Sequence, residues 1–87
     1  MKIIYEYKLS LAAEQKVKLY KNAEILSCKN QNGLLKIWAL CDKDEDESDE
    51  RSIVIVGTGQ PMKKYISPVF IDTVMIDEFV WHVFELK

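Results

Sequence analysis

The segment GTGQP, residues Gly57 to Pro61, follows the apolar run Ile53 to Val56 and combines two glycines with a hydroxyl and an amide. Glycine-rich turns bind phosphate when successive backbone amides point at the anion. A P-loop needs GxxxxGK[ST] and a dinucleotide site needs GxGxxG opening a helix, and neither pattern is present. The segment therefore predicts a tight turn, and the open alternative is an anion-binding turn aided by Thr58 and Gln60.

A ligand site at this turn would need a cation for phosphate and an aromatic ring for a planar group. Arg51, the only arginine of the chain, or Lys63 would supply the cation. Trp38 and Trp81 are predicted core residues, with stacking on a ligand or anchoring an interface as the alternative. The candidate ligand-binding residues are Arg51, Gly57, Thr58, Gly59, Gln60, Lys63, Trp81 and His82.

His82 is the only histidine, and in FVWHVFEL it shares a strand face with Val80, Phe84 and Leu86. Such a residue is predicted to be a hydrogen-bonded core or interface group. Acid–base catalysis requires an orienting carboxylate, and the sequence identifies none. No serine lies in a GxSxG motif, so we predict no catalytic residue and no enzyme activity.

The run from Asp42 to Glu50, DKDEDESDE, holds seven of the fourteen acidic residues and no apolar side chain. Like charges repel and stay solvated, so the run predicts an acidic loop over 42–50 that joins two strands. Clustered carboxylates can also dock on a basic protein surface. The candidate partner-binding residues are Asp44, Glu45, Asp46, Glu47, Asp49 and Glu50.

Metal and cofactor sites are not indicated. Cys28 and Cys41 lie thirteen positions apart, with no CxxC motif and no nearby histidine. We expect both to be buried free thiols, and we expect neither a metal site nor a cofactor.

The elements that position these residues are predicted to be strands, because apolar and polar residues alternate along much of the chain. In KIIYEYKL, alternate residues from Ile3 to Leu9 are apolar, which predicts a half-buried strand. The segment Ser10 to Gln15 is compatible with one helical turn but is far shorter than a stable helix, so we expect it to be a connection. Leu34 to Cys41 is apolar on both faces apart from Lys36, which predicts a central strand covered on both sides.

Two hairpins follow from turn chemistry. Asn32-Gly33 separates two β-compatible runs, and both residue types tolerate positive φ. Asp77-Glu78 separates the last two apolar runs. The prediction is an all-β (or mostly β) fold, a small antiparallel barrel or sandwich of about six to seven strands with at most one short helical turn.

Composition limits the classes of function. The 87 residues are predicted to form a single domain, 1–87, that is 48% hydrophobic. A net charge of −2 disfavours direct binding to nucleic acid. No apolar stretch is long enough to cross a bilayer, and Glu6 interrupts any signal peptide, so we expect a cytoplasmic protein without membrane contact.

Taken together, MKIIYEYKL, AEILSCKNQNG with LKIWAL, GTGQP and VWHVFE resemble a family of short proteins encoded by phages and prophages, a domain of unknown function. The resemblance covers nearly the whole chain. In that family a histidine commonly stands at the position of Gln60 and a valine at that of Cys41. The departure at Gln60 weakens an acid–base role for the turn. The resemblance implies a phage context, hence the cytoplasm of a host bacterium.

The leading hypothesis is a non-enzymatic, homo-oligomeric counter-defence protein. It would sequester a small phosphorylated, nucleotide-derived host immune signal in pockets at subunit interfaces, because so small a domain has little internal volume. One alternative is an inhibitor that binds a host defence protein, a nuclease or CRISPR effector, through the acidic loop. A minor phage structural or assembly protein is the other alternative.

Overall fold

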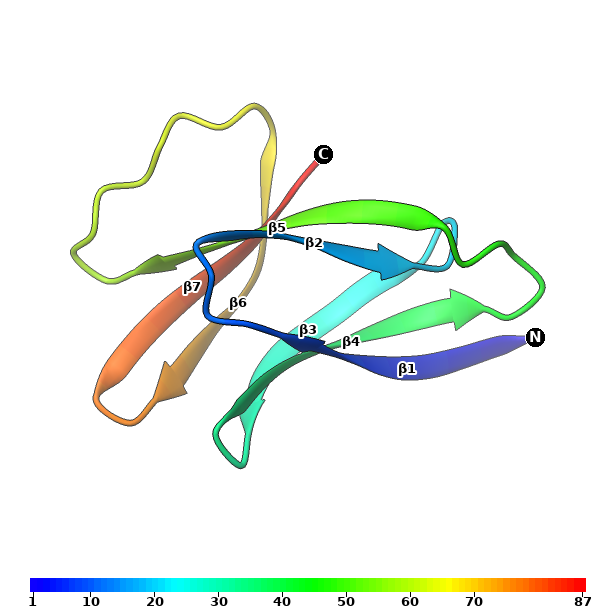
Figure 1. The fold of residues 1–87 in the computed structure, drawn as a ribbon, viewed down its shortest axis with the longest axis horizontal. Coiled ribbons are helices and arrows are strands. Elements are labelled where there is room, and N and C mark those ends of the chain that lie inside the picture. Colours follow the sequence, from blue (N-terminus) through cyan, green and yellow to red (C-terminus); the bar gives the residue numbers. More distant parts are fainter.

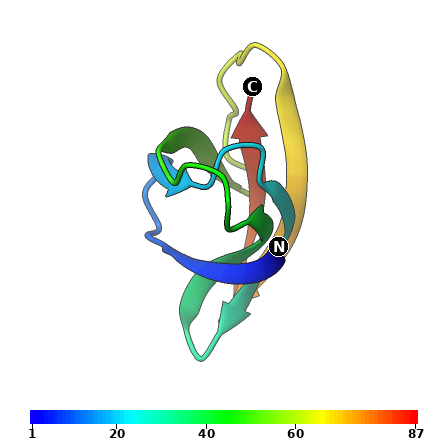
Figure 2. The same cartoon turned by 90° about the vertical axis from the view of Figure 1, so that its right-hand side faces the viewer.

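All 87 residues are described in the computed structural model, which is built entirely from β-strands (Figure 1). The strands are β1 (Lys2–Leu9), β2 (Glu14–Leu19), β3 (Glu24–Gln31), β4 (Leu34–Asp42), β5 (Asp49–Gly57), β6 (Pro68–Ile76) and β7 (Phe79–Leu86). The chain measures 41 × 31 × 16 Å, and Figure 2 shows its narrow dimension. The predicted all-β fold is confirmed. The structure contains no helix that is long and apolar enough to span a membrane.

Two antiparallel sheets face each other. One has the strand order β1-β4-β3 and the other β2-β5-β7-β6. Alternation along the strands explains the pairing, because one side of each strand supplies the core between the sheets. The core side chains include Leu9, Val17, Leu19, Cys28, Leu35, Ile37, Ala39, Cys41, Ile53, Ile55, Val74 and Val83.

Both predicted hairpins are present. Asn32 and Gly33 take φ values of 54° and 83° between β3 and β4, and the amide of Gly33 donates to the Asn30 side chain at 2.8 Å. Asp77 takes φ 54° between β6 and β7. The left-handed conformation that asparagine, aspartate and glycine tolerate therefore sets both turns.

Of two predictions about connections, one is confirmed and one is wrong. The segment from Ser10 to the start of β2 is an open connection without a helical turn, and the Gln15 side chain holds it: Gln15 accepts from the Ser10 amide at 3.0 Å and donates to the Ser10 carbonyl at 2.8 Å. The acidic loop is shorter than 42–50, since β4 continues through Asp42 and β5 begins at Asp49.

The strand β4 is central in its sheet, as predicted, but only one of its faces is covered. Leu35 and Ile37 are buried, whereas Trp38 and Leu40 on the outer face are half-buried and Leu34 is exposed. No element packs on this outer face, because the second sheet covers the other side alone. Trp38 is therefore not a core residue.

The edge strands β3 and β6 lie side by side and are joined by side chains. Each has a register irregularity, at Leu26 and at Ile71. The Asp72 carboxylate accepts from the Cys28 amide at 3.1 Å and pairs with Lys29 at 3.2 Å. Although partial burial opposes ionisation, these hydrogen bonds lower the pKa of Asp72. The carboxylate thus seals two sheet edges that would otherwise be open to other chains.

The two cysteines are buried and unpaired, as predicted. Burial raises the pKa of the Cys28 thiol to about 12, and the neighbouring Asp72 carboxylate adds to the shift. A thiol with so high a pKa holds almost no thiolate near neutral pH and is therefore unreactive.

Candidate functional site

The structure separates the predicted ligand-binding residues into two groups at opposite ends of β5 and β7. Gly57 pairs with Trp81 at one end, and Ser52 pairs with Leu86 at the other, next to Arg51. Gly57 lies six positions after Arg51 along β5, which corresponds to about 20 Å. Arg51 therefore does not join the turn at a common site.

The GTGQP segment is a tight turn, and most of its amides donate inside the protein. The Gly57 amide donates to Oε1 of Gln60 at 3.0 Å, and the Gln60 amide donates back to the Gly57 carbonyl at 3.1 Å. The Thr58 amide donates to the Val80 carbonyl at 3.0 Å, and Gly59 takes φ 84°. With three of four amides engaged, the turn offers an anion little beyond the amide of Gly59.

Beside this turn lies a hollow of about 300 Å³, here named the turn hollow. Its two aromatic residues, Phe79 and Trp81, have ring centroids 6.2 Å apart and planes inclined by 37°. The lining residues are Gly57, Thr58, Gln60, Glu78, Phe79, Val80 and Trp81. Glu78 is the sole charged residue among them, so the walls suit an uncharged planar group or a cation better than an anion.

Gly57 is required where the turn meets the aromatic wall. A Cβ atom at this position would lie 2.8 Å from Oε1 of Gln60 and 3.2 Å from the Trp81 ring. The missing side chain lets Gln60 fold back and lets the indole lie against the backbone.

His82 lies on the outer face of β7, half-buried, between two hydroxyl groups. Its Nε2 is 2.8 Å from Oγ1 of Thr58, and its Nδ1 is 3.1 Å from Oγ1 of Thr73. The neutral ring can donate through one nitrogen and accept through the other. A hydroxyl cannot stabilise an imidazolium as the carboxylate of a catalytic triad does. The arrangement therefore suits a structural bridge that joins the turn after β5 to β7 and β6.

Arg51 is part of a buried ion pair at the far end of the same strands. Its Nη2 donates to Oε1 of Glu85 at 3.1 Å, its Nε donates to the other carboxylate oxygen, and its Nη1 donates to the Ala23 carbonyl at 3.0 Å. Glu85 is only 4% exposed. The Glu85 hydrogen bond raises the pKa of Arg51, against the effect of burial. The guanidinium is therefore committed to the fold.

Lys63 is also engaged, in the loop 58–67 that arches away from the sheet in Figure 1. Its Nζ lies 3.1 Å from Oε1 of Glu14, and the Tyr65 hydroxyl donates to the same oxygen at 2.8 Å. The hydrogen bonds from Tyr65 and Lys63 lower the pKa of Glu14. Together the three side chains tether the loop to β2.

Sequence reasoning missed four participants: Glu14, Tyr65, Phe79 and Glu85. Two signals were available. Phe79 alternates with Trp81 along one strand, and Glu85 continues the same face as the only carboxylate on it, which required a cation such as the single arginine.

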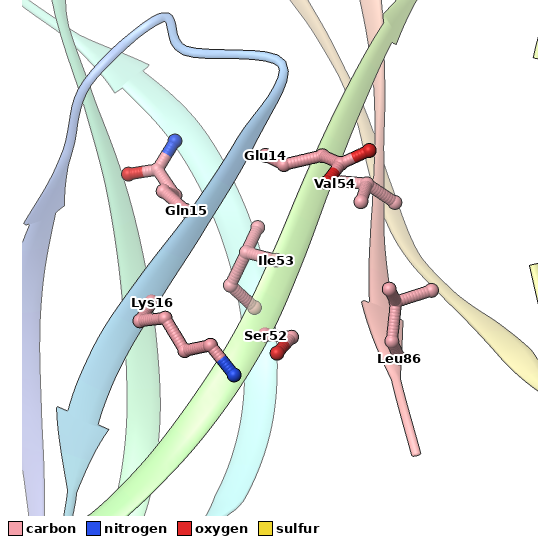
Figure 3. Close-up of a pocket in the computed structure, with 7 residues that line it drawn as sticks. All are labelled: Glu14, Gln15, Lys16, Ser52, Ile53, Val54 and Leu86. Carbon is pink, nitrogen blue, oxygen red and sulfur yellow. The ribbon is translucent and has the colours of Figure 1, made fainter. Parts of the chain in front are cut away.

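A second hollow of about 300 Å³ lies on the outer face of the four-stranded sheet (Figure 3). Glu14 and Lys16 border it from β2, and Leu86 borders it from β7. Val54 on its floor is 1% exposed, yet it lies outside the core cluster between the sheets. This outer face therefore buries an apolar side chain of its own.

The candidate partner-binding carboxylates fall into two groups, one in the connection between β4 and β5 and one in β5 itself. The connection Lys43–Ser48 between β4 and β5 is exposed and carries Asp44, Glu45, Asp46 and Glu47. Asp49 and Glu50 belong to β5, where Asp49 lies 3.6 Å from Nη1 of Arg51. The structure shows no group of three or more ligand-type side chains that could hold a metal ion.

Residues 1–87 match a family model described as a domain of unknown function, DUF7352. The chain belongs to the DUF7352 family. Neither a curated protein nor a solved structure matches it. Because the match spans both the turn hollow and the Arg51–Glu85 pair, both are parts of one DUF7352 domain.

Proposed function

We propose that this DUF7352 protein acts by binding and that the turn hollow is its ligand site. The observation that carries the proposal is the meeting of Trp81 and Phe79 with the side chains of Thr58 and Gln60 in one hollow. Aromatic rings bind the faces of planar groups, and hydroxyl and amide groups bind their edges. Binding sites for small molecules commonly have this composition.

A nucleobase is the planar group favoured by this chemistry, which supports a nucleotide-derived ligand. The phosphate is not provided for within one subunit, because Arg51 and Lys63 are paired with Glu85 and Glu14. A sequestered nucleotide would therefore take its phosphate contacts from a second subunit. In the phage context implied by the sequence resemblance, this is sequestration of a host immune signal in the bacterial cytoplasm.

Binding is favoured over catalysis by the surroundings of His82. The two hydroxyl partners, Thr58 and Thr73, occupy both ring nitrogens. A general base needs a free nitrogen aimed at substrate and a group that stabilises its charged form.

The exposed segment Lys43–Ser48 supports the alternative function, which is inhibition of a host nuclease or CRISPR effector. Asp44 pairs with the N-terminal ammonium at 3.1 Å, whereas Glu45, Asp46 and Glu47 form no ion pair. Solvated charges of one sign can dock on a basic surface, and such binding weakens as salt rises.

The chain contains two tryptophans, which gives the test a matched pair. Calorimetric titration with nucleosides, nucleoside monophosphates and cyclic dinucleotides should show binding to the wild type and to Trp38→Ala. Trp81→Ala should bind about 5- to 150-fold more weakly, the range expected for the loss of one stacked base. Circular dichroism checks that both variants are folded.

Trp38→Phe leaves Trp81 as the sole indole, so its fluorescence should respond to the bound ligand. Equal losses in both alanine variants, or no binding of any nucleoside or nucleotide by the wild type, would exclude the turn hollow as a nucleotide site. If binding to a purified effector were instead lost on replacing the carboxylates of 44–47 by amides, the alternative function would be supported.

A further inference from the structure

The outer face of the four-stranded sheet carries no formal charge over β6 and β7. Two of its side chains are largely exposed: Phe70 at 56% and Met75 at 67%. The cross-strand neighbours on this face are Pro68 with Leu86, Phe70 with Phe84, Thr73 with His82, and Met75 with Val80. These eight residues, with Val54 and Val56 of β5, are named the uncharged face.

Its few polar side chains are already satisfied within the chain. His82 bonds to Thr73 on the same face and to Thr58 at its border. Removing water from a polar group is costly only when the group loses its hydrogen bonds. The uncharged face can therefore be covered without leaving a side-chain donor or acceptor unpaired.

We propose that a second copy of this chain covers the uncharged face, so that the protein is a homodimer packed sheet on sheet. In a two-fold dimer the same patch meets itself, and a patch that bears charge of one sign would repel its copy. This patch bears none. A strongly charged partner would gain no ion pair here, whereas an identical apolar sheet packs well at the usual spacing of about 10 Å.

The residues of β2 that border the uncharged face also favour a second copy of this chain as the partner. Glu14, Lys16 and Lys18 alternate on the outer side of β2, next to the hollow of Figure 3, and carry both signs of charge. A two-fold axis can bring a carboxylate of one copy near an ammonium of the other. An apolar centre with a polar rim of mixed charge is the usual composition of a specific interface.

The outer side of the whole four-stranded sheet, which is the uncharged face together with its β2 border, is large enough for an interface. Its four strands average eight residues, so it projects to roughly 19 by 27 Å, about 500 Å², and two copies bury about 1,000 Å² or more, the minimum for a specific interface. The monomer also exposes 5742 Å², more than the roughly 5,300 Å² expected for a monomer of its mass.

The test compares two exposed apolar residues on opposite sides of the molecule. Phe70→Glu places a charge on the uncharged face, and Ile4→Glu places one on the outer face of the other sheet, where Ile4 is equally exposed at 56%. Sedimentation equilibrium without ligand should give a dimer for the wild type and for Ile4→Glu, and a monomer for Phe70→Glu.

Met75→Glu is a second variant on the same face and guards against a folding defect specific to Phe70. A wild type that sediments as a monomer would overturn the proposal, as would dimers in both Phe70→Glu and Met75→Glu. Because no ligand is present, the result is independent of the turn hollow. Val80 belongs to both the face and the hollow, so a confirmed dimer would place the second subunit beside the ligand site.

Discussion

The two ends of the β5–β7 pair were expected to form one ligand site, and the structure gives them different tasks. At one end, Arg51 and Glu85 bury opposite charges and satisfy them with hydrogen bonds. At the other, Gly57 and Trp81 border an open hollow with no cation. The contrast teaches that the single arginine holds the fold, while the proposed binding chemistry is aromatic and uncharged.

The largest expected effect lies at the ion-pair end. Glu85→Gln leaves the Arg51 guanidinium without its counter-charge in a largely buried position, which should cost about 3–5 kcal/mol of the free energy of unfolding. Urea unfolding measures the loss. The double variant Arg51→Met/Glu85→Leu should recover much of the stability, because it removes both charges. A single variant as stable as the wild type would show that the pair does not hold this end of the sheet.

An intermediate effect is expected at the hollow end. Gly57→Ala forces the Gln60 side chain to swing out and give up its hydrogen bond, and it presses on the Trp81 ring, at a cost of about 1–2 kcal/mol. Calorimetry should also show weaker binding of the nucleotide bound by the wild type, because the hollow changes shape.

Gly59→Ala is the matched control for this substitution. It meets no neighbour, so its cost, about 1–2 kcal/mol, comes only from the positive φ of the backbone. Its ligand affinity should stay near that of the wild type. Equal losses of affinity in the two variants would contradict the role assigned to Gly57.

The smallest effect is expected at Glu14, whose carboxylate is exposed to solvent, whereas that of Glu85 is buried. The Tyr65 hydroxyl and Lys63 lower the pKa of Glu14 in the folded state, so the tether is fully present above the ordinary carboxyl pKa of about 4.3. It is lost as the pH falls through the lowered pKa of the folded state. NMR signals of Tyr65 should shift below about pH 4, and Glu14→Gln should remove most of that pH dependence. A Tyr65 signal that titrates unchanged in Glu14→Gln would show that the tether is not formed.

Much of the fold followed from local signals in the sequence. Asn32-Gly33 and Asp77 set hairpin turns through positive φ, and the alternation from Ile3 to Leu9 identified a strand and its inner side. The order of the strands in each sheet, and whether one or both faces of β4 are covered, depend on contacts between residues distant in sequence. An apolar stretch such as Leu34–Cys41 is compatible with either one or two covered faces, and Trp38 was misplaced for this reason.

The candidate site was predicted in part. The turn lies beside Trp81 and His82 because β5 pairs with β7, with Gly57 opposite Trp81 and Val56 opposite His82. Arg51 was assigned to the wrong end, since its residue type suits phosphate and a buried carboxylate equally well. Only the pairing of Ile53 with Glu85 brings the Glu85 carboxylate next to Arg51, and this pairing of residues 32 positions apart in the chain was not readable from the sequence.

The Asp72 contact with the Cys28 amide has a consequence for the order of folding. It joins residues 44 positions apart, whereas the β3–β4 and β6–β7 hairpins form between chain neighbours. Closing a long loop costs more entropy than closing a short turn, so we expect the hairpins to assemble first and this contact to form late. Asp72→Asn should then speed unfolding and leave the refolding rate nearly unchanged in stopped-flow experiments. Slower refolding of the variant would place the contact in the transition state instead.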